Sequence, residues 1–224
     1  MNLGILYVVA TPIGNLNDIT LRALDVLKSV DLILCEDTRV SRKLLTHYKI
    51  STQTESMHAH TKPEKITNII KQINFGKNIA VITDAGTPTV SDPGSALLDR
   101  AWQDKIKVVP IPGASAITTA FSVSGFSDKE FLFLGYIPKK KGREKFLKTL
   151  LESPYPVIFF ESPHQIEKLI EQLKNILNSD HKILIARELT KIYETIYRGK
   201  IQDLEISKIG KIKGEFTIIV DKTR

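Results

Sequence analysis

The sequence is poor in cysteine, with Cys35 alone among its 224 residues. A single thiol cannot form an internal disulfide bond, and it cannot supply the C-x-x-C pairs that hold most structural zinc ions. We therefore expect neither a disulfide scaffold nor a bound metal. One unpaired thiol suits a reducing compartment, so a cytoplasmic location is expected.

Long hydrophobic runs are also missing. No apolar stretch approaches the length that a helix needs to span a bilayer. The first residues, Met1 to Gly4, lack the charged region of a signal peptide and lead directly into an apolar segment. These features predict a protein without a leader peptide and without a membrane partner.

Several nucleotide-binding and catalytic motifs are absent. The segment Ala10–Asp18 holds only Gly14, whereas a dinucleotide fingerprint needs three glycines. There is no G-x-x-x-x-G-K-[ST] loop and no G-x-S-x-G elbow, which disfavours P-loop and α/β-hydrolase chemistry. His58 and His60 fit two polar loop residues better than a metal pair, and His164 fits a helix start better than an acid–base group.

Positive charge is in excess, with a formal net charge of +7. Such a charge favours a polyanionic partner, and nucleic acid is the commonest one. A codon bias that favours lysine explains the same net charge without any anionic partner. The net charge alone therefore does not decide whether the protein binds nucleic acid. The composition is otherwise typical of a soluble globular protein, large enough for one large domain or two small ones.

The richest local signal is the stretch Asp84–Gly94, which reads D-A-G-T-P-T-V-S-D-P-G. It follows the apolar, β-branched segment Asn78–Thr83, which predicts a buried strand. Glycine opens backbone angles that other residues avoid, and proline fixes φ, so the loop should be stiff and bent. Connections from strand to helix usually take about 2–6 residues, and this one is longer. It therefore predicts a ligand-binding loop, although a well-capped connection is the simpler alternative.

Strand and helix patterns alternate along the first half of the chain and predict a parallel α/β domain. The expected strands of that half are residues 4–10, 31–35, 78–83 and 107–111. The second half is richer in strands and predicts a mixed-sheet α/β domain, with strands at residues 131–135, 157–160, 183–186, 191–198 and 216–220. The boundary is expected near Pro112–Gly113, giving domains 1–113 and 114–224. Residues 51–60 fit neither pattern.

Polar loops follow most of these strands, at residues 11–18, 36–39, 84–94, 112–116, 161–164 and 187–191. Because parallel strands end at one edge of a sheet, many of these loops should meet. They offer hydroxyls, carboxylates and small residues, which suit an uncharged adenine and ribose better than a triphosphate.

Five motifs carry a resemblance to a known family, and they cover nearly the whole chain in order. They are YVVATPIGNLND from Tyr7, CEDTR from Cys35, the Asp84–Gly94 stretch, PGASA from Pro112 and FESPH from Phe160. Together they are similar to the ribosomal RNA small subunit methyltransferase I family of the tetrapyrrole methylase-like superfamily. Longer members carry an extra C-terminal segment beyond the position of Arg224.

The resemblance implies two α/β domains with S-adenosylmethionine in the cleft between them, a homodimer, and 2'-O-methylation of a decoding-centre cytidine of 16S rRNA in the small ribosomal subunit. The implied cofactor-binding residues are Pro12, Asp84, Ala85, Gly86, Thr87, Val90, Ser91, Asp92, Ser115, Ala116, Ala186 and Thr217. For Ser115 and Ala116 helix capping is the alternative.

A ribose hydroxyl is a poor nucleophile, so a general base within hydrogen-bond reach would help the transfer. The candidate bases are Glu36, Asp37, Glu161 and Glu188, with structural ion pairs to Arg39, Arg187 or Lys191 as the alternative. The candidate RNA-binding residues are Arg39, Arg42, Lys43, Lys139, Lys140, Lys141, Arg143 and Lys191, with a solvated charge run as the alternative.

Two other hypotheses remain open at this point. A methylase of the same fold could act on a small molecule or a protein side chain, in which case the basic residues are incidental. A non-catalytic RNA-binding factor could keep the same loops without methyl transfer.

Overall fold

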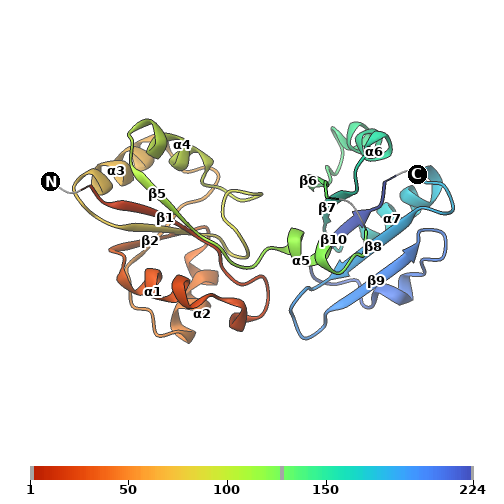
Figure 1. Cartoon of the computed structure of the whole chain (residues 1–224), viewed down its shortest axis with the longest axis horizontal. Coiled ribbons are helices and arrows are strands. Elements are labelled where there is room, and N and C mark those ends of the chain that lie inside the picture. Colours follow the sequence, from red (N-terminus) through yellow and green to blue (C-terminus); the bar gives the residue numbers. More distant parts are fainter. Residues whose placement is uncertain (1–2, 127–128, 223–224) are drawn as a thin grey trace. The chain divides into compact units, whose positions relative to one another are not determined.

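The computed structural model describes residues 3–126 and 129–222. The chain divides into two compact units, residues 1–115 and 116–224. Each unit has its own five-stranded sheet (Figure 1) and is described separately below.

The N-terminal unit is built on a wholly parallel sheet. Its strands are β1 (Ile5–Val9), β2 (Leu32–Cys35), β3 (Thr54–Ser56), β4 (Ile79–Ile82) and β5 (Lys107–Ile111). They lie in the order β3-β2-β4-β1-β5, and every neighbouring pair is parallel. The expected parallel α/β domain is therefore confirmed, and the carboxyl ends of its strands share one edge.

Helices cover both faces of this sheet. They are η1 (Leu16–Asp18), α1 (Leu21–Ser29), α2 (Thr38–His47), α3 (Pro63–Asn74) and α4 (Ser95–Gln103). In Figure 1, α1 and α2 lie on one side and α3 and α4 on the other. Successive strand residues alternate between the faces: Leu34 and Val81 pack with α3 and α4, whereas Cys35 and Ile82 pack with α1 and α2. Burial on both faces explains why these strands read as continuous apolar runs.

Strand β3 is the element that the sequence did not reveal. It is three residues long and lies at the sheet edge beside β2, with Thr54 and Ser56 exposed. A short, polar edge strand leaves no apolar alternation in the sequence, because few of its side chains enter the core.

The C-terminal unit has a mixed sheet, as expected. Its elements are α5 (Ala116–Ser122), β6 (Leu132–Tyr136), α6 (Arg143–Glu152), β7 (Val157–Glu161), α7 (Ile166–Ile176), β8 (Lys182–Arg187), β9 (Thr195–Lys200), η2 (Ile206–Ile209) and β10 (Phe216–Val220). The strand order is β6-β7-β10-β8-β9. β6 and β7 are parallel, and the other neighbours are antiparallel. The expectation that residues 191–194 are part of a strand was wrong, because they form a turn before β9.

Helices α6 and α7 pack on one face of the mixed sheet and form its main core. Phe159 of β7 is completely buried there, and its ring meets that of Phe146 on α6 edge-on at 5.3 Å between centroids. Strand residues of opposite parity, including Phe160 and Thr217, lie on the other face.

Among the residues described, the structure contains no helix that is long and apolar enough to cross a membrane.

Replacing Phe159 by alanine should lower the free energy of unfolding of the C-terminal unit by about 3–5 kcal/mol, because it removes a fully buried ring from a close-packed core. Urea unfolding measures this loss. Tyr155→Ala is the matched control: Tyr155 is 39% exposed, so its loss should cost about 0.5 kcal/mol or less. Equal losses for the two variants would contradict the packing described above.

Candidate functional site

The loops that follow β1 and β4 are joined by a pair of backbone hydrogen bonds. The Thr11 amide donates to the Gly86 carbonyl at 2.9 Å, and the Gly86 amide donates to the Thr11 carbonyl at 3.0 Å. The buried Thr11 hydroxyl also donates to the Thr83 carbonyl at 3.1 Å. Gly86 has a φ of +86°, and a Cβ there would lie 3.3 Å from Ile13 Cγ2. Glycine therefore lets the two loops meet at the middle of the sheet edge.

The loop after β2 joins the same edge through polar side chains. The Thr83 hydroxyl donates to Glu36 Oε2 at 2.6 Å, and the Asp37 amide donates to Asp84 Oδ1 at 3.1 Å. These two contacts bring the acidic side chains of Glu36 and Asp84 to the ends of neighbouring strands, beside Asp37. Asp37 in turn caps α2 by accepting a hydrogen bond from the Arg39 amide at 2.8 Å.

The loop after β5 completes the rim. The Ala10 amide donates to the Ile111 carbonyl at 3.1 Å, and the Thr87 hydroxyl donates to the Ala114 carbonyl at 3.4 Å. A Cβ at Gly113 would lie only 3.0 Å from the Ala10 Cβ, so glycine permits this close approach. Loops from β1, β2, β4 and β5 thus form one connected rim of the N-terminal unit.

The loop Asp84–Gly94, which we call the central loop, turns back on itself and exposes small side chains. Gly94 has a φ of +133°, and a Cβ there would lie 2.8 Å from Thr89 Cγ2. Thr89 itself has a φ of +69°, which is uncommon for a β-branched residue. Ala85, Val90 and Ser91 are exposed, with Val90 52% exposed. The loop therefore presents small side chains at this edge of the sheet.

The rim is electrostatically negative at its centre. Burial raises the pKa of the Asp84 carboxyl, and repulsion from Glu36 and Asp37 raises it further. Hydrogen bonds from the side chain and the backbone of Arg39 have the opposite effect on Asp37 and lower its pKa to about 2. A cationic ligand with hydroxyl donors fits such a surface better than an anionic one.

The remaining residues expected at the cofactor lie at defined places. Pro12 is buried just after Thr11, Asp92 is half-buried in the central loop, and Ser115 and Ala116 directly follow Ala114. Ala186 and Thr217 are opposite each other on β8 and β10 in the C-terminal unit, and both are buried. The structure thus groups the N-terminal residues on the rim and pairs the two C-terminal ones.

Glu161, one of the candidate bases, lies inside the C-terminal unit. Its carboxylate is 4% exposed and lies 3.6 Å from the guanidinium of Arg143, which is 8% exposed. Arg143 also donates to Gln172 Oε1 at 2.9 and 2.7 Å and to the Pro138 carbonyl at 3.2 Å. Among the described residues, Glu161 Oε2 accepts no hydrogen bond. This geometry is that of a buried structural ion pair.

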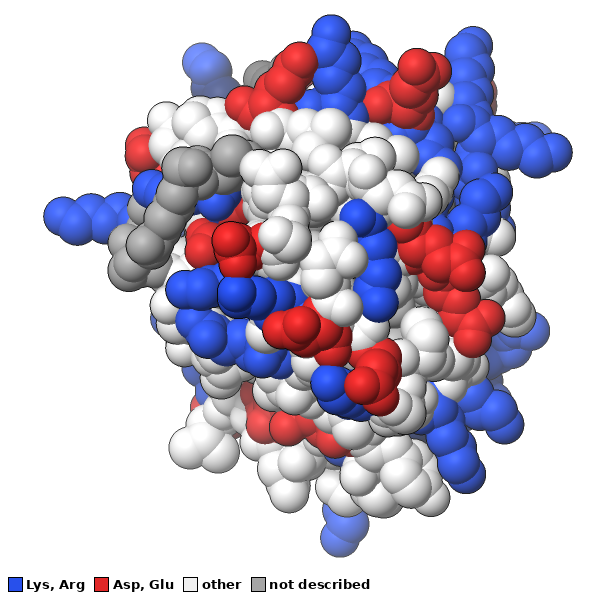
Figure 2. Space-filling model, turned by 90° about the vertical axis from the view of Figure 1, so that its right-hand side faces the viewer, with Lys and Arg blue, Asp and Glu red and all other residues white. Residues whose placement is uncertain are grey.

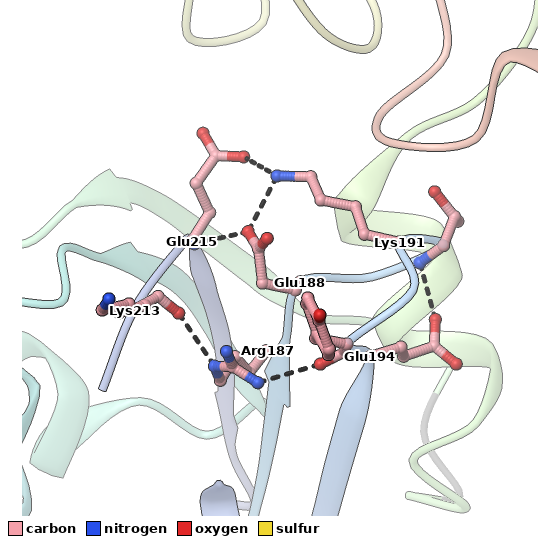
Figure 3. A network of polar contacts seen from close by, with 8 residues as sticks. Arg187, Glu188, Lys191, Glu194, Lys213 and Glu215 are labelled. Atoms are coloured by element: carbon pink, nitrogen blue, oxygen red, sulfur yellow. Dashed lines mark hydrogen bonds and ion pairs between the residues drawn. The ribbon is translucent and has the colours of Figure 1, made fainter. Parts of the chain in front are cut away.

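Glu188 belongs to a second ion-pair network, at the turn between β8 and β9 (Figure 3). It accepts hydrogen bonds from the Lys191 ammonium at 2.8 Å and from the Glu215 amide at 3.0 Å. Burial raises the pKa of Glu188, but these hydrogen bonds outweigh burial and hold its pKa below the usual value. Arg187 fixes the same turn through the carbonyls of Lys213 and Tyr193.

Three of the four candidate bases are therefore engaged in ion pairs. Asp37 pairs with Arg39 at 2.6 Å, Glu161 with Arg143 and Glu188 with Lys191. In the part of the chain that the structure describes, Glu36 has no ion pair. The structural alternative raised from the sequence holds for these three carboxylates, although the partner of Glu161 was not foreseen.

The candidate RNA-binding residues divide by exposure. Arg39, Arg42, Lys43 and Lys139–Lys141 are exposed, whereas Lys191 lies in the network with Glu188. The expectation that Arg143 belongs to an exposed basic loop was wrong, because Arg143 begins α6 and is buried. On the face shown in Figure 2, Lys and Arg side chains are spread among Asp and Glu rather than gathered in one patch.

Thr11 and Thr83 are the rim residues that the sequence analysis missed as site components. Both are polar side chains at the very end of an apolar strand, and both are buried, at 2% and 3% exposure. A threonine at the end of an apolar strand could have indicated these positions from the sequence, because a buried hydroxyl needs a hydrogen-bond partner.

The described residues contain no group of three or more His, Cys, Asp or Glu side chains that could hold a metal ion. Cys35 is buried at the end of β2, and burial raises the pKa of its thiol, which disfavours a reactive thiolate.

Comparison with known proteins places residues 5–205 in a family described as Tetrapyrrole (Corrin/Porphyrin) Methylases. Relatives named ribosomal RNA small subunit methyltransferase I are similar over nearly the whole chain. The protein from Thermotoga maritima is 42% identical, covering 97% of this chain and 98% of its own. That from Borrelia garinii is 46% identical, covering 97% and 99%. That from Haemophilus influenzae is 43% identical, covering 97% and 78%.

Solved structures of the same fold are more distant in sequence. Cobalt precorrin-4 methyltransferase matches with a TM-score of 0.70 at 17% identity, covering 97% of this chain and 94% of that one. Uroporphyrin-III C-methyltransferase from Thermus thermophilus matches with a TM-score of 0.67 at 18% identity, covering 98% and 94%. These likenesses confirm the fold.

Replacing Glu161 by glutamine should lower the free energy of unfolding by about 3 kcal/mol, because it leaves the buried Arg143 guanidinium without its counter-charge. Urea unfolding measures the loss. The double variant Arg143→Met with Glu161→Leu should recover most of it, since an apolar pair of similar volume can replace a buried ion pair. A Glu161→Gln variant as stable as wild type would contradict the buried ion pair.

The pKa values of Asp84 and Asp37 predict opposite pH dependences. The raised pKa of Asp84 means that its stabilising contribution is complete below its unfolded pKa of about 3.9 and is lost as the pH rises through the folded value. Asp84→Asn keeps an oxygen for the Asp37 amide. The variant should therefore gain stability relative to wild type as the pH rises from about 3.5 to 7.

Asp37→Asn is the matched control of opposite sign. The lowered pKa of Asp37 gives stability above about pH 4 that is lost as the pH falls toward 2. This variant should be less stable than wild type at pH 7, with a difference that shrinks on acidification. Urea unfolding at a series of pH values measures both trends, and parallel trends would contradict the assignment.

Proposed function

The chain belongs to the tetrapyrrole methylase family, within its ribosomal RNA small subunit methyltransferase I group, and we propose that it methylates the ribose 2'-hydroxyl of a decoding-centre cytidine in 16S rRNA. The observation that carries this proposal is the identity of 42–46% with relatives of that name over 97% of the chain. Methyl transfer is the activity common to the family, and the chain is a methyltransferase.

The proposed methyl donor is S-adenosylmethionine, which supplies a methyl group already activated by a positively charged sulfur. The rim of the N-terminal unit fits such a donor chemically. Asp84 provides negative charge for its cationic groups and an acceptor for its ribose hydroxyls, and Glu36 adds negative charge beside it. The exposed Val90 offers an apolar contact.

The domain roles follow from these groups. We assign most cofactor contacts to residues 1–113, on the loops after β1, β4 and β5, with residues 114–224 as the second domain. Ala186 and Thr217 form the C-terminal contribution, since they are opposite each other on the two central strands β8 and β10.

The chain's own task in the reaction is to position the ribose hydroxyl and to accept its proton. S-adenosylmethionine, when bound, would supply the methyl group to the 2'-oxygen and leave as the neutral thioether, and the hydroxyl proton would go to a base of this chain. Glu36 is the base that we propose, because Asp37, Glu161 and Glu188 are each held by a cation. The Thr83 hydroxyl, at 2.6 Å, orients the Glu36 carboxylate.

The proposed substrate is RNA in the assembled small subunit, in the cytoplasm, bound by a homodimer. The basic residues proposed to contact phosphates are exposed: Arg39, Arg42, Lys43 and Lys139–Lys141. Contacts to phosphates supply most of the nonspecific affinity for nucleic acid. Arg143 and Lys191 are left out of this set, because their side chains are only 8% and 31% exposed beside carboxylates, whereas that of Arg39 is 87% exposed although it pairs with Asp37.

Labelled methyl groups from S-adenosylmethionine should enter 16S rRNA when the protein is incubated with small subunits that lack the modification, and nuclease digestion should place the label on a cytidine ribose. Glu36→Gln should reduce the rate by about 10²-fold or more, since general base catalysis contributes about 10²–10⁴-fold. Lys77→Gln is the control, because Lys77 is exposed just before the amino end of β4, whereas the rim lies at the carboxyl ends of the strands.

Label found only in protein or in a small molecule would replace this proposal by a same-fold methylase of other specificity. Calorimetry that detects no binding of S-adenosylmethionine would support a non-catalytic RNA-binding factor instead. Light scattering of the purified protein tests the homodimer separately.

A further inference from the structure

Strand β6 contains a β-bulge that changes the direction of one aromatic side chain. Phe133 is opposite Ile158 on β7, and Tyr136 is opposite Phe160, so β6 advances three residues while β7 advances two. Gly135 lies within the bulge at a φ of +67°. Residues three apart on a regular strand point to opposite faces, and the extra residue puts Phe133 and Tyr136 on the same face.

The bulge creates a cluster of three rings, which we call the aromatic platform: Phe133, Tyr136 and Phe160. The Phe160 ring lies 5.2 Å from that of Phe133 and 5.2 Å from that of Tyr136, between centroids. Tyr136 remains 56% exposed. The Tyr136 ring is therefore held against Phe160 and still open to solvent, which makes it available for stacking.

The aromatic platform shares a row with the proposed cofactor contacts of this unit. Phe160 is opposite Thr217 on β10, and Thr217 is opposite Ala186 on β8. Their neighbours Phe159, Ile218 and Ile185 all pack into the core under α6 and α7. By alternation, the row and the platform lie on the other face of the sheet.

Positive charge adjoins the aromatic platform. The exposed lysines Lys139–Lys141 begin three residues after Tyr136. The intervening segment is anchored from within, because the buried Arg143 guanidinium donates to the Pro138 carbonyl at 3.2 Å and pairs with Glu161. The loop that carries the lysines therefore starts from a fixed point beside the rings. Arg143 supplies this fixed point, although it follows the exposed lysines in the sequence.

We propose that the aromatic platform stacks an unpaired base of the RNA substrate while Lys139–Lys141 contact the adjoining phosphates. Aromatic side chains beside basic groups are the usual means of holding single-stranded RNA, since every base has a face that stacks. The lysines favour this polyanion over an apolar protein surface. The inference rests on the proposed function and adds the residues that hold the substrate.

The test measures binding of a short, fluorescein-labelled, cytidine-rich single-stranded RNA by anisotropy at several salt concentrations. Tyr136→Leu should weaken binding about tenfold, and Tyr136→Phe should retain it, because the ring supplies the stacking. Tyr155→Leu is the matched control, an exposed tyrosine of the same unit that should bind as wild type does.

The salt dependence separates the two parts of the proposed surface. Tyr136→Leu should leave the slope of log affinity against log salt unchanged, since stacking releases no counterions. Replacing Lys140 by glutamine should reduce that slope by about one phosphate contact. A Tyr136→Leu variant with unchanged RNA affinity, or one with weaker S-adenosylmethionine binding in calorimetry, would overturn the proposal.

Two variants of Gly135 test the bulge. Asparagine tolerates the left-handed backbone of Gly135 and should retain RNA affinity, whereas valine disfavours it and should weaken binding as Tyr136→Leu does. A Cβ at Gly135 would meet no atom within 4 Å, so only backbone strain separates the two. Equal affinities in folded protein would contradict the role of the bulge.

The methyl-transfer assay keeps this inference distinct from the proposed function. If wild type methylates small subunits and binds the oligonucleotide, but Tyr136→Leu matches it in affinity, the platform fails and the function stands. If wild type transfers no methyl group to RNA, but the Tyr136→Leu variant binds the oligonucleotide more weakly than wild type does, the proposed function fails and the aromatic platform stands. Wild type that binds no single-stranded RNA overturns the platform.

Discussion

The pair of backbone hydrogen bonds between Thr11 and Gly86 is the contact on which the N-terminal site depends. A parallel sheet brings strand ends to one edge, but it does not by itself join the loops that leave them. Here the two central loops pair as a miniature antiparallel bridge, and the Thr11 hydroxyl closes the bridge onto the end of β4. The other loops then attach to this fixed centre, through Glu36 and Asp84 on one side and Ala114 on the other.

The acidic side chains differ in proton affinity according to the residues that the fold places beside them. Asp37, Glu161 and Glu188 each face a basic group, and a paired carboxylate is a poor proton acceptor because its charged form is already stabilised. Asp84 lies in the opposite environment, where burial and like charges favour the protonated form. A positively charged ligand would relieve that repulsion, which links the electrostatics of the rim to the charge of the proposed methyl donor.

Methyl transfer from an activated donor asks a protein mainly for placement, because the electrophile needs no further activation. The two units fix their loops and strands in different ways. The N-terminal unit uses glycine and proline to stiffen loops, whereas the C-terminal unit has a bulged edge strand, paired central strands and a buried ion pair. In the C-terminal unit the buried Arg143 donates to the Pro138 carbonyl and pairs with Glu161. Its guanidinium therefore holds a loop in place and is not exposed to contact a phosphate.

The sequence by itself determined the fold class and the place of the central loop. Buried strands read as apolar runs, and the glycines and prolines of Asp84–Gly94 mark a loop whatever surrounds them. The sequence did not predict the edge strand β3, because its side chains barely enter the core. Only the tertiary structure decided which carboxylates are paired, that Arg143 is buried and that Tyr136 joins Phe133 on one face. Those outcomes depend on contacts between residues distant in sequence and on a one-residue shift in strand register, and neither leaves a local pattern in the chain.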